Sequence, residues 1–414
     1  MSFASVLFAR FARLRRKSQD LRASGGSFGR VVAYNARFVM KKFPLLWKLV
    51  GAKRERQHVL TVLKAGKEAA DAPPEVCVNV AGAGIGDHII AARFVRDLAK
   101  YCGPITADFA SYYVERDEWV FRTTPGFRAM RNAFLFGDIA PHYALAIEIS
   151  QVVSLRHVNE AHPALSITAP LGKTVRALRA FQDRYADDIA GLPYSSAQLG
   201  RKAVYANCNR ATFLQAQAGI AYGGDLFDLP RDDGILARLG LRSRSYVTVH
   251  NGFGPEFIIS GSRATKCYPY LAKVVDQLKR KRPNLVFVQL GRETSTPIPG
   301  VDRNLLCATT MPEVVSLLAN AALHLDNESG LVHLAACSGT RSCVIFGPTD
   351  ADYFGYPNNI NVRPALCGGC WWINDSWLDQ CPRGFETAPC MASISPDQVV
   401  DGLLPALADG TPKN

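Results

Sequence analysis

Short β-rich runs alternate with helical stretches along most of the chain, and this alternation is the feature that most restricts its fold. Residues 76–82, VCVNVAG, read as a buried strand, and residues 88–103 after the glycine-rich turn carry apolar side chains at helical spacing. A second series of the same kind begins at residues 246–252, YVTVHNG. Strands that alternate with helices form parallel sheets covered by helices, so the sequence predicts an α/β protein with two Rossmann-like domains.

The length and the turn-forming residues predict how these domains are divided. The 414 residues are enough for two cores, since single domains usually contain about 100–200 residues. A polar, turn-rich stretch low in β-formers indicates the linker. We expect an extension over residues 1–72, a first domain over 73–230, a linker over 231–245 and a second domain over 246–414. Ligands of such sheets bind outside the carboxyl ends of the strands, so the two domains are expected to face a cleft.

The net charge of +12 is concentrated in the extension. Residues 10–64 contain fifteen Lys and Arg and two acids, a net charge of +13, which leaves the rest of the chain near neutral. Apolar positions from Phe3 to Leu14 predict a basic amphipathic helix, and a basic-aromatic cluster lies at 41–48. The pattern is typical of attachment to an anionic membrane surface, or of a solvated or domain-packed extension. Nucleic acid binding is disfavoured because the neutral body carries no recognisable nucleic-acid module.

The sequence contains no apolar run of the roughly 18 residues that a membrane-spanning helix needs. It also shows no charged lead and small-residue cleavage pattern typical of a signal peptide. We therefore expect a cytoplasmic protein, with peripheral attachment to the inner face of the cytoplasmic membrane as the alternative. Eleven cysteines in such a protein indicate free thiols or a metal site rather than a disulfide framework.

The first predicted strand leads into a glycine loop, Gly82, Gly84 and Gly86, followed by Asp87. This loop resembles a dinucleotide fingerprint, but Asp87 stands at the sixth position, where its charge would oppose a pyrophosphate. A carboxylate at a helix N-terminus is favoured as an anion and is well placed to accept a proton from a hydroxyl group. Asp87 is therefore a candidate base, and the alternative is that it only caps the helix.

Polar residues also follow several predicted strands of the second domain. A cation, a helix N-terminus with free N–H donors and hydroxyl groups are the groups that bind a diphosphate. The alternative is that Ser329 is an ordinary N-cap and His333 a packed helix histidine. The candidate donor-binding residues are Lys266, Asn327, Glu328, Ser329, Gly330, His333, Gly347, Pro348 and Thr349.

These motifs resemble glycosyltransferase family 9, the bacterial heptosyltransferase family with the GT-B fold. The resemblance extends over roughly residues 76–407, and its strongest part is DNESGLVHLAACSGTRSCVIFGPTD. Lys266-Cys267-Tyr268-Pro269 matches a second family element, with Tyr268 in place of the commoner Trp. Glu328 stands where the family usually has Asp, and Asp87 falls on the position proposed as the catalytic base.

The resemblance implies an inverting transferase that takes a sugar from a nucleotide diphosphate without a catalytic metal. The leading expectation is heptose transfer from ADP-heptose to a bacterial envelope glycan or glycolipid such as lipopolysaccharide. It assigns the acceptor to the first domain and the nucleotide sugar to the second. The alternatives are another nucleotide-sugar donor, a protein acceptor, or a metal-stabilised binding protein that has lost catalysis.

Four cysteines lie close together near the C-terminus, in the pattern C-x2-C-x10-C-x8-C. Four thiolates with a CxxC turn suit a tetrahedral zinc or iron site of a structural kind, because they leave no open coordination position. The alternatives are four reduced thiols under a loop and a zinc-ribbon nucleic-acid module, which no neighbouring Lys/Arg cluster supports. The candidate metal ligands are Cys367, Cys370, Cys381 and Cys390.

Overall fold

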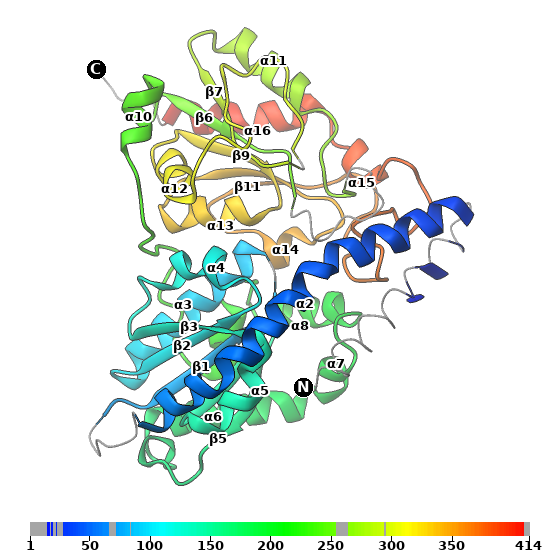
Figure 1. Ribbon diagram of the computed structural model, residues 1–414. Helices are drawn as coiled ribbons and strands as arrows, with labels where there is room; N and C mark the ends of the chain where they lie inside the picture. The colour runs from blue at the N-terminus through cyan, green and yellow to red at the C-terminus, as the bar shows by residue number, and fades with distance from the viewer. Residues whose placement is uncertain are drawn as a thin grey trace. The chain divides into compact units, whose positions relative to one another are not determined.

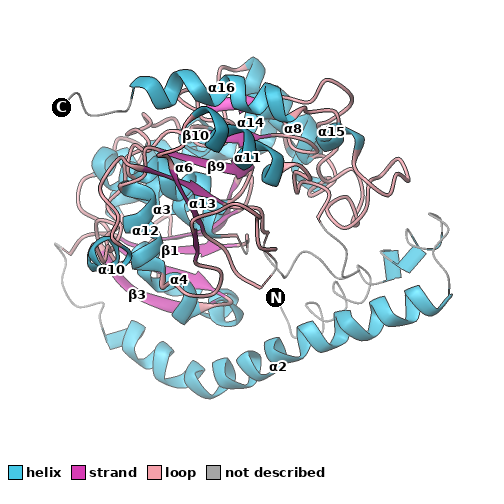
Figure 2. Cartoon of the chain, turned by 90° about the horizontal axis from the view of Figure 1, so that it is seen from above, coloured by secondary structure: helices cyan, strands magenta, loops and turns pink. Residues whose placement is uncertain are grey.

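The computed structural model describes residues 15–16, 18–19, 22, 28–65, 72–82, 84–253, 264–293 and 295–409. Contacts divide the chain into two compact units. Unit 1 contains Met1–Leu192 and Thr212–Gly224, and unit 2 contains Pro193–Ala211 and Asp225–Asn414. Each unit is built around a largely parallel sheet flanked by helices (Figures 1 and 2). The predicted α/β class is therefore confirmed.

Unit 1 has a five-stranded sheet in the order β3-β2-β1-β4-β5. The last strand is antiparallel to β4, and the other neighbours are parallel. The strands are β1 Glu75–Val80, β2 Thr106–Ser111, β3 Phe127–Asn132, β4 Leu145–Ile149 and β5 Val153–Val158. The helices are α2 Phe28–Ala65, α3 Ile85–Cys102, α4 Val114–Phe121, α5 Phe136–Ile139, α6 Pro170–Arg184, α7 Ala186–Ala190 and α9 Phe213–Ala218.

Part of the expected extension belongs to the core of unit 1. Ala52, Val59 and Leu63 of α2 are buried against one face of the sheet, where Cys77 and Ala110 also lie. The C-terminal part of α2 is therefore packed onto the domain, as one of the two sequence alternatives expected. The predicted helix that begins at Phe3, and the side chains of the 41–48 cluster, lie outside the described residues, so membrane attachment stays a prediction.

Among the described residues, no helix combines the length and the apolar character that crossing a membrane requires.

Unit 2 has an all-parallel, six-stranded sheet in the order β11-β10-β9-β6-β7-β8. Its strands are β6 Tyr246–Val249, β7 Val286–Gln289, β8 Arg303–Asn304, β9 Leu323–Asn327, β10 Ser342–Ile345 and β11 Ile360–Val362. Its helices are α8 Ser196–Tyr205, α10 Gly234–Leu239, α11 Leu271–Lys281, α12 Met311–Ala319, α13 Gly330–Cys337, α14 Ala351–Phe354, α15 Pro389–Ala392 and α16 Pro396–Asp409.

The core of unit 2 explains how its helices are arranged. Helices α11 and α16 pack on the face that carries Val247, Leu323 and Ile345, and α12 and α13 lie on the other face (Figure 1). The division of the chain differs from the single linker expected at 231–245, because that stretch contains α10. Helix α8 precedes that stretch yet belongs to unit 2, where Gly200 packs closely on Tyr353 and Trp371.

Candidate active site

Both sheets reverse their strand order at one point, and in sheets of this kind ligands bind outside the carboxyl ends of the strands at that point. In unit 1 the reversal lies between β1 and β4, and β1 leads into the glycine loop. In unit 2 it lies between β6 and β9, and β9 ends at Asn327. Asp87 in unit 1 and Glu328, Ser329 and Gly330 in unit 2 therefore follow a strand at the reversal point.

Asp87 lies in the first turn of α3, and its carboxylate rests against the glycine loop. A Cβ atom at Gly82 would lie 2.3 Å from Asp87 Oδ2, so this approach requires glycine there. Gly84 is the N-cap residue, and its carbonyl oxygen accepts a hydrogen bond from the Asp87 N–H at 3.1 Å. The loop thus holds a carboxylate at a helix N-terminus, where negative charge is favoured.

His88 and Asp117 form a buried ion pair beside this loop, and the sequence analysis missed both. His88 Nδ1 donates to the Gly84 carbonyl oxygen at 2.8 Å, and His88 Nε2 lies 2.9 Å from Asp117 Oδ2. Burial would raise the pKa of Asp117, but hydrogen bonds and charges from His88 and Arg116 lower it to about 2. The glycine loop is therefore tied to α4 through the contact of His88 with Asp117.

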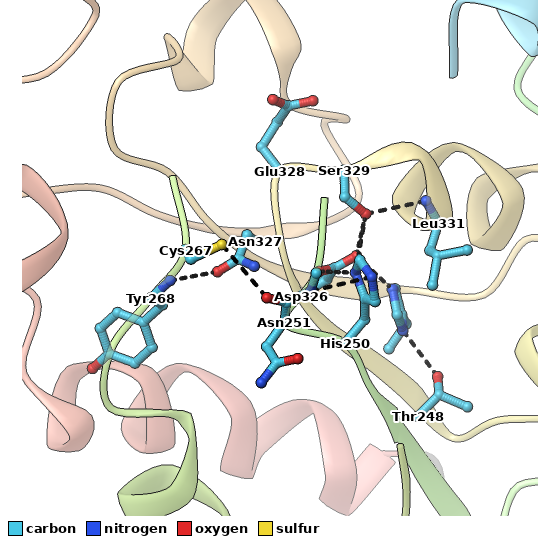
Figure 3. A network of polar contacts seen from close by, with 12 residues as sticks. Thr248, His250, Asn251, Cys267, Tyr268, Asp326, Asn327, Glu328, Ser329 and Leu331 are labelled. Atoms are coloured by element: carbon cyan, nitrogen blue, oxygen red, sulfur yellow. Dashed lines mark hydrogen bonds and ion pairs between the residues drawn. The ribbon is translucent and has the colours of Figure 1, made fainter. Parts of the chain in front are cut away.

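In unit 2, a network of buried polar side chains joins the ends of β6 and β9 (Figure 3). Asp326 is fully buried and accepts from His250 Nδ1 at 2.8 Å, from His324 Nε2 at 3.1 Å and from the Ser329 hydroxyl. Thr248 Oγ1 lies 3.0 Å from His324 Nδ1. Burial alone would raise the pKa of Asp326, but His250 and His324 outweigh it and lower the pKa to about 2.

Ser329 is the N-cap residue of α13, and its hydroxyl group both accepts and donates a hydrogen bond. The oxygen accepts from the Leu331 N–H at 3.2 Å, and the hydroxyl hydrogen is donated to Asp326. A phosphate at this helix end would therefore rely on backbone N–H groups and on neighbouring cations.

The remaining candidates around β9 are held by local contacts. Asn327 Oδ1 accepts from the Tyr268 N–H at 2.8 Å, which joins β9 to the Lys266 element. Lys266 Nζ and Glu328 Oε2 form a half-buried ion pair at 3.2 Å. The predicted diphosphate cation thus lies beside the end of β9.

His333 and the turn after β10 complete the predicted set. His333 Nδ1 lies 2.7 Å from the Tyr356 hydroxyl, and His333 is buried in α13. Gly347, Pro348 and Thr349 follow β10 after Phe346, and the Thr349 hydroxyl is buried with no hydrogen-bond partner in the described part of the chain. The structure therefore brings the unit 2 candidates to the same edge of one sheet.

The four candidate metal ligands are free cysteines, and their thiols influence one another. Burial, together with the charges of Cys381 and Cys367, raises the pKa of Cys370 to about 11. Burial also raises the pKa of Cys390 to about 12, with contributions from the other three cysteines. Within the ranges that the structure describes, however, no group of three or more His, Cys, Asp or Glu side chains is arranged to hold a metal ion. The side chains as placed therefore do not fit a metal.

Comparisons with known proteins bear on the family and the fold. Residues 212–367 match the model of glycosyltransferase family 9 (heptosyltransferase). The structure is similar to that of the E. coli ADP-heptose lps heptosyltransferase II, with a TM-score of 0.50 and 14% identity over 80% of this chain and 98% of that chain. A comparison with curated proteins gave no match.

A second similar structure is the bacterial iron-containing dodecameric glycosyltransferase TibC from enterotoxigenic E. coli H10407. The TM-score is 0.51 at 13% identity, over 82% of this chain and 77% of that chain. TibC in complex with ADP-D-beta-D-heptose gives a TM-score of 0.51 at 14% identity, with the same coverage. At such low identities the similarity to these structures shows only the fold. The relation to family 9 rests on the match of residues 212–367. Residues 212–367, which extend from unit 1 into unit 2, therefore match glycosyltransferase family 9, and the chain is a glycosyltransferase with the GT-B fold.

Proposed function

We propose that this glycosyltransferase transfers a sugar, with inversion, from a nucleotide diphosphate to a bacterial envelope glycan such as lipopolysaccharide. Heptose from ADP-heptose is the leading donor, supported by the similarity to TibC, which binds ADP-D-beta-D-heptose, and to the ADP-heptose heptosyltransferase II. The observation that carries the proposal is that Lys266 lies beside the N-terminus of α13 at the strand reversal of unit 2, within the segment that matches family 9.

The first half of the reaction concerns the acceptor. A hydroxyl oxygen of the acceptor attacks the anomeric carbon and forms the new C–O bond. Its proton passes to the Asp87 carboxylate, which would act as the general base. Gly82 allows this carboxylate to lie over the glycine loop, and His88 fixes the loop through the Gly84 carbonyl oxygen.

The second half concerns the leaving group. The bond between the anomeric carbon and the diphosphate oxygen breaks, and the electron pair leaves with the nucleoside diphosphate. Lys266 and the N-terminal N–H groups of α13 would stabilise this growing negative charge. The Ser329 hydroxyl would fix the helix end rather than contact phosphate, since its hydrogen goes to Asp326.

A donor panel tests this proposal. The purified chain is incubated with ADP-heptose, UDP-glucose and GDP-mannose, each with lipopolysaccharide lacking its outer sugars. We expect nucleoside diphosphate release and sugar transfer with one donor, and loss of both in Asp87→Asn. Transfer from a different donor would show that ADP-heptose is not the donor. Transfer to a protein would show that the acceptor is not an envelope glycan. Absence of nucleotide-sugar binding and turnover would favour the binding-protein alternative.

A structural metal at the four cysteines is a second part of the proposal. The similarity to TibC, which is iron-containing, supports it, and the electrostatic interaction among the four thiols shows that they lie near one another. The thiols would have to turn toward one point, since the described side chains form no metal-binding group as placed. We expect about one zinc or iron per chain by elemental analysis, released by acid or a strong chelator. Metal-free protein with an unchanged melting temperature would contradict this.

A further inference from the structure

The Cys-rich segment, residues 367–391, contacts two separate elements of the candidate donor site. The first is the turn after β10. The Gly369 N–H donates to the Gly347 carbonyl oxygen at 3.3 Å, and the Trp371 N–H donates to the Pro348 carbonyl oxygen at 3.0 Å. The backbone on either side of Cys370 is therefore hydrogen-bonded directly to the Gly347–Thr349 turn.

Side-chain packing tightens this contact. A Cβ atom at Gly347 would lie 2.4 Å from Met391 Sδ and 3.3 Å from Cys390 Sγ. A Cβ atom at Gly368, where φ is +145°, would lie 2.9 Å from the Gly347 carbonyl oxygen. The turn is thus held between the first and the last parts of the segment, and glycine is required on both sides of the contact.

The second element is the stretch that carries Lys266. The Thr265 N–H donates to the Leu378 carbonyl oxygen at 2.9 Å, and Thr265 Oγ1 donates to the Trp377 carbonyl oxygen at 2.9 Å. Thr265, Trp377 and Leu378 are all buried. The residue directly before the predicted phosphate-binding lysine is therefore anchored to the middle of the Cys-rich segment.

The segment is also fixed to the rest of unit 2. Trp371 stacks on Tyr353 with ring centroids 5.6 Å apart and meets Phe354 edge-on at 4.8 Å. The Tyr194 hydroxyl donates to Asp375 Oδ2 at 2.8 Å. The segment thus contacts the candidate donor site through one set of residues and other parts of unit 2 through a second set.

We propose that the Cys-rich segment is a clasp that positions Lys266 and the Gly347–Thr349 turn for the donor diphosphate. The proposal rests on the proposed function, because it assumes that these two elements bind the diphosphate. It requires no metal, since backbone contacts and the Thr265 hydroxyl carry it. Thr265 is accordingly a positioning residue, and loosening the clasp should affect phosphate binding and spare the nucleoside.

Two matched variants of the full chain test the clasp. Thr265→Val removes the hydroxyl that binds Trp377 and keeps the side-chain shape, whereas Tyr194→Phe removes a hydroxyl on the other side of the segment. Calorimetry measures the Kd of ADP, UDP and GDP, with the matching nucleoside as reference, and thermal melting is recorded in parallel. We expect Thr265→Val to weaken the best diphosphate about threefold to tenfold, the usual effect of one buried hydrogen bond, and to leave nucleoside binding unchanged.

A control variant and a rescue variant distinguish an effect on the position of the donor site from an effect on stability. Tyr194→Phe should lower the melting temperature and keep the diphosphate Kd, and Thr265→Ser should restore the parent Kd because it retains the hydroxyl. Should Thr265→Val fail to fold, Thr265→Ala and Thr265→Ser form the same pair. The clasp is overturned if diphosphate affinity is unchanged in the valine or alanine variant, or if nucleoside affinity falls equally. If the parent chain binds none of the diphosphates, the proposed function fails, and the clasp with it.

Discussion

Unit 1 and unit 2 reverse their strand order in the same way, but they carry different chemistry at the reversal point. In unit 1 the strand leads to a carboxylate, Asp87, that rests on Gly82. In unit 2 it leads to a helix N-terminus beside the cation of Lys266, and the nearby Asp326 is fully buried and satisfied by three donors. In the proposed mechanism, the same fold therefore presents a proton acceptor in one unit and an anion site in the other.

The difference teaches that the side chains at the strand ends, and not the strand order, decide the chemistry. A carboxylate near a phosphate would repel it unless its charge is compensated. Unit 2 contains two carboxylates beside the predicted phosphate site, Glu328 paired with Lys266 and Asp326 paired with His250. In unit 1, Asp117 is compensated by His88 and Arg116, and Asp87 is the proton acceptor of the proposed mechanism.

The strongest test of this comparison removes the charge in unit 1. Asp87→Asn keeps the shape of the side chain but cannot accept the proton, so we expect turnover to fall about 10²- to 10⁴-fold while the donor Kd is unchanged. Steady-state kinetics and calorimetry measure the two quantities. Turnover within a few-fold of the parent would contradict the role of Asp87.

A second variant keeps the carboxylate but moves it. Gly82→Ala would place a Cβ atom 2.3 Å from Asp87 Oδ2 and 2.8 Å from Asp87 Cβ, so the side chain must shift as a whole. We expect a loss of turnover that approaches that of Asp87→Asn. Gly51→Ala in the same unit, with open space around its Cβ, controls for the effect of an added methyl group.

An intermediate effect is expected for the cation of unit 2. Lys266→Ala should weaken ADP binding about 10- to 100-fold, the usual worth of a charge-assisted hydrogen bond, and adenosine binding much less. Part of the loss arises because Glu328 is left unpaired near the phosphates. Glu328→Gln in the Lys266→Ala background should therefore recover some ADP affinity. Unchanged ADP affinity in Lys266→Ala would rule out the assigned role.

Most of the fold could be predicted, because buried parallel strands are apolar and continuous. The predicted strands at residues 76–82 and 246–252 correspond to β1 and β6, which begin the two sheets. No strand was predicted at β3, β5, β8 or β11, and these four strands occupy the sheet edges. Edge strands are only partly buried, and β3 carries Arg128 and Arg131, which pair with the buried Asp108 of β2. Charged residues of this kind interrupt the apolar run by which a buried strand is predicted.

The sequence located the candidate residues but not their hydrogen bonds. Ser329 was identified as an N-cap or an anion ligand, and only the structure shows that its hydrogen goes to Asp326. His250 and Asp326 are 76 positions apart, and they meet because Val249 of β6 pairs with Leu325 of β9. No local pattern encodes this register. The one available signal was a histidine and an aspartate at the ends of two apolar strands.

The smallest effect is expected for Asp326→Asn, which should change the free energy of unfolding rather than the reaction. Because the folded-state pKa is lowered to about 2 from 3.8, ionised Asp326 stabilises the fold above about pH 4, and this contribution is lost as the pH falls toward 2. Asp326→Asn should therefore lower the free energy of unfolding by about 2 kcal/mol at neutral pH, and by progressively less in acid.

Urea unfolding of the parent and the variant at several pH values measures this difference. Asp276→Asn, which removes an exposed ion pair with Arg280, should change the free energy of unfolding by only about 0.5 kcal/mol or less. A difference between Asp326→Asn and the parent that stays constant from neutral pH into acid would show that the asparagine disturbs packing instead. The buried carboxylate of unit 2 would then not be stabilised by its histidine partners, and its contrast with Asp87 would rest on burial alone.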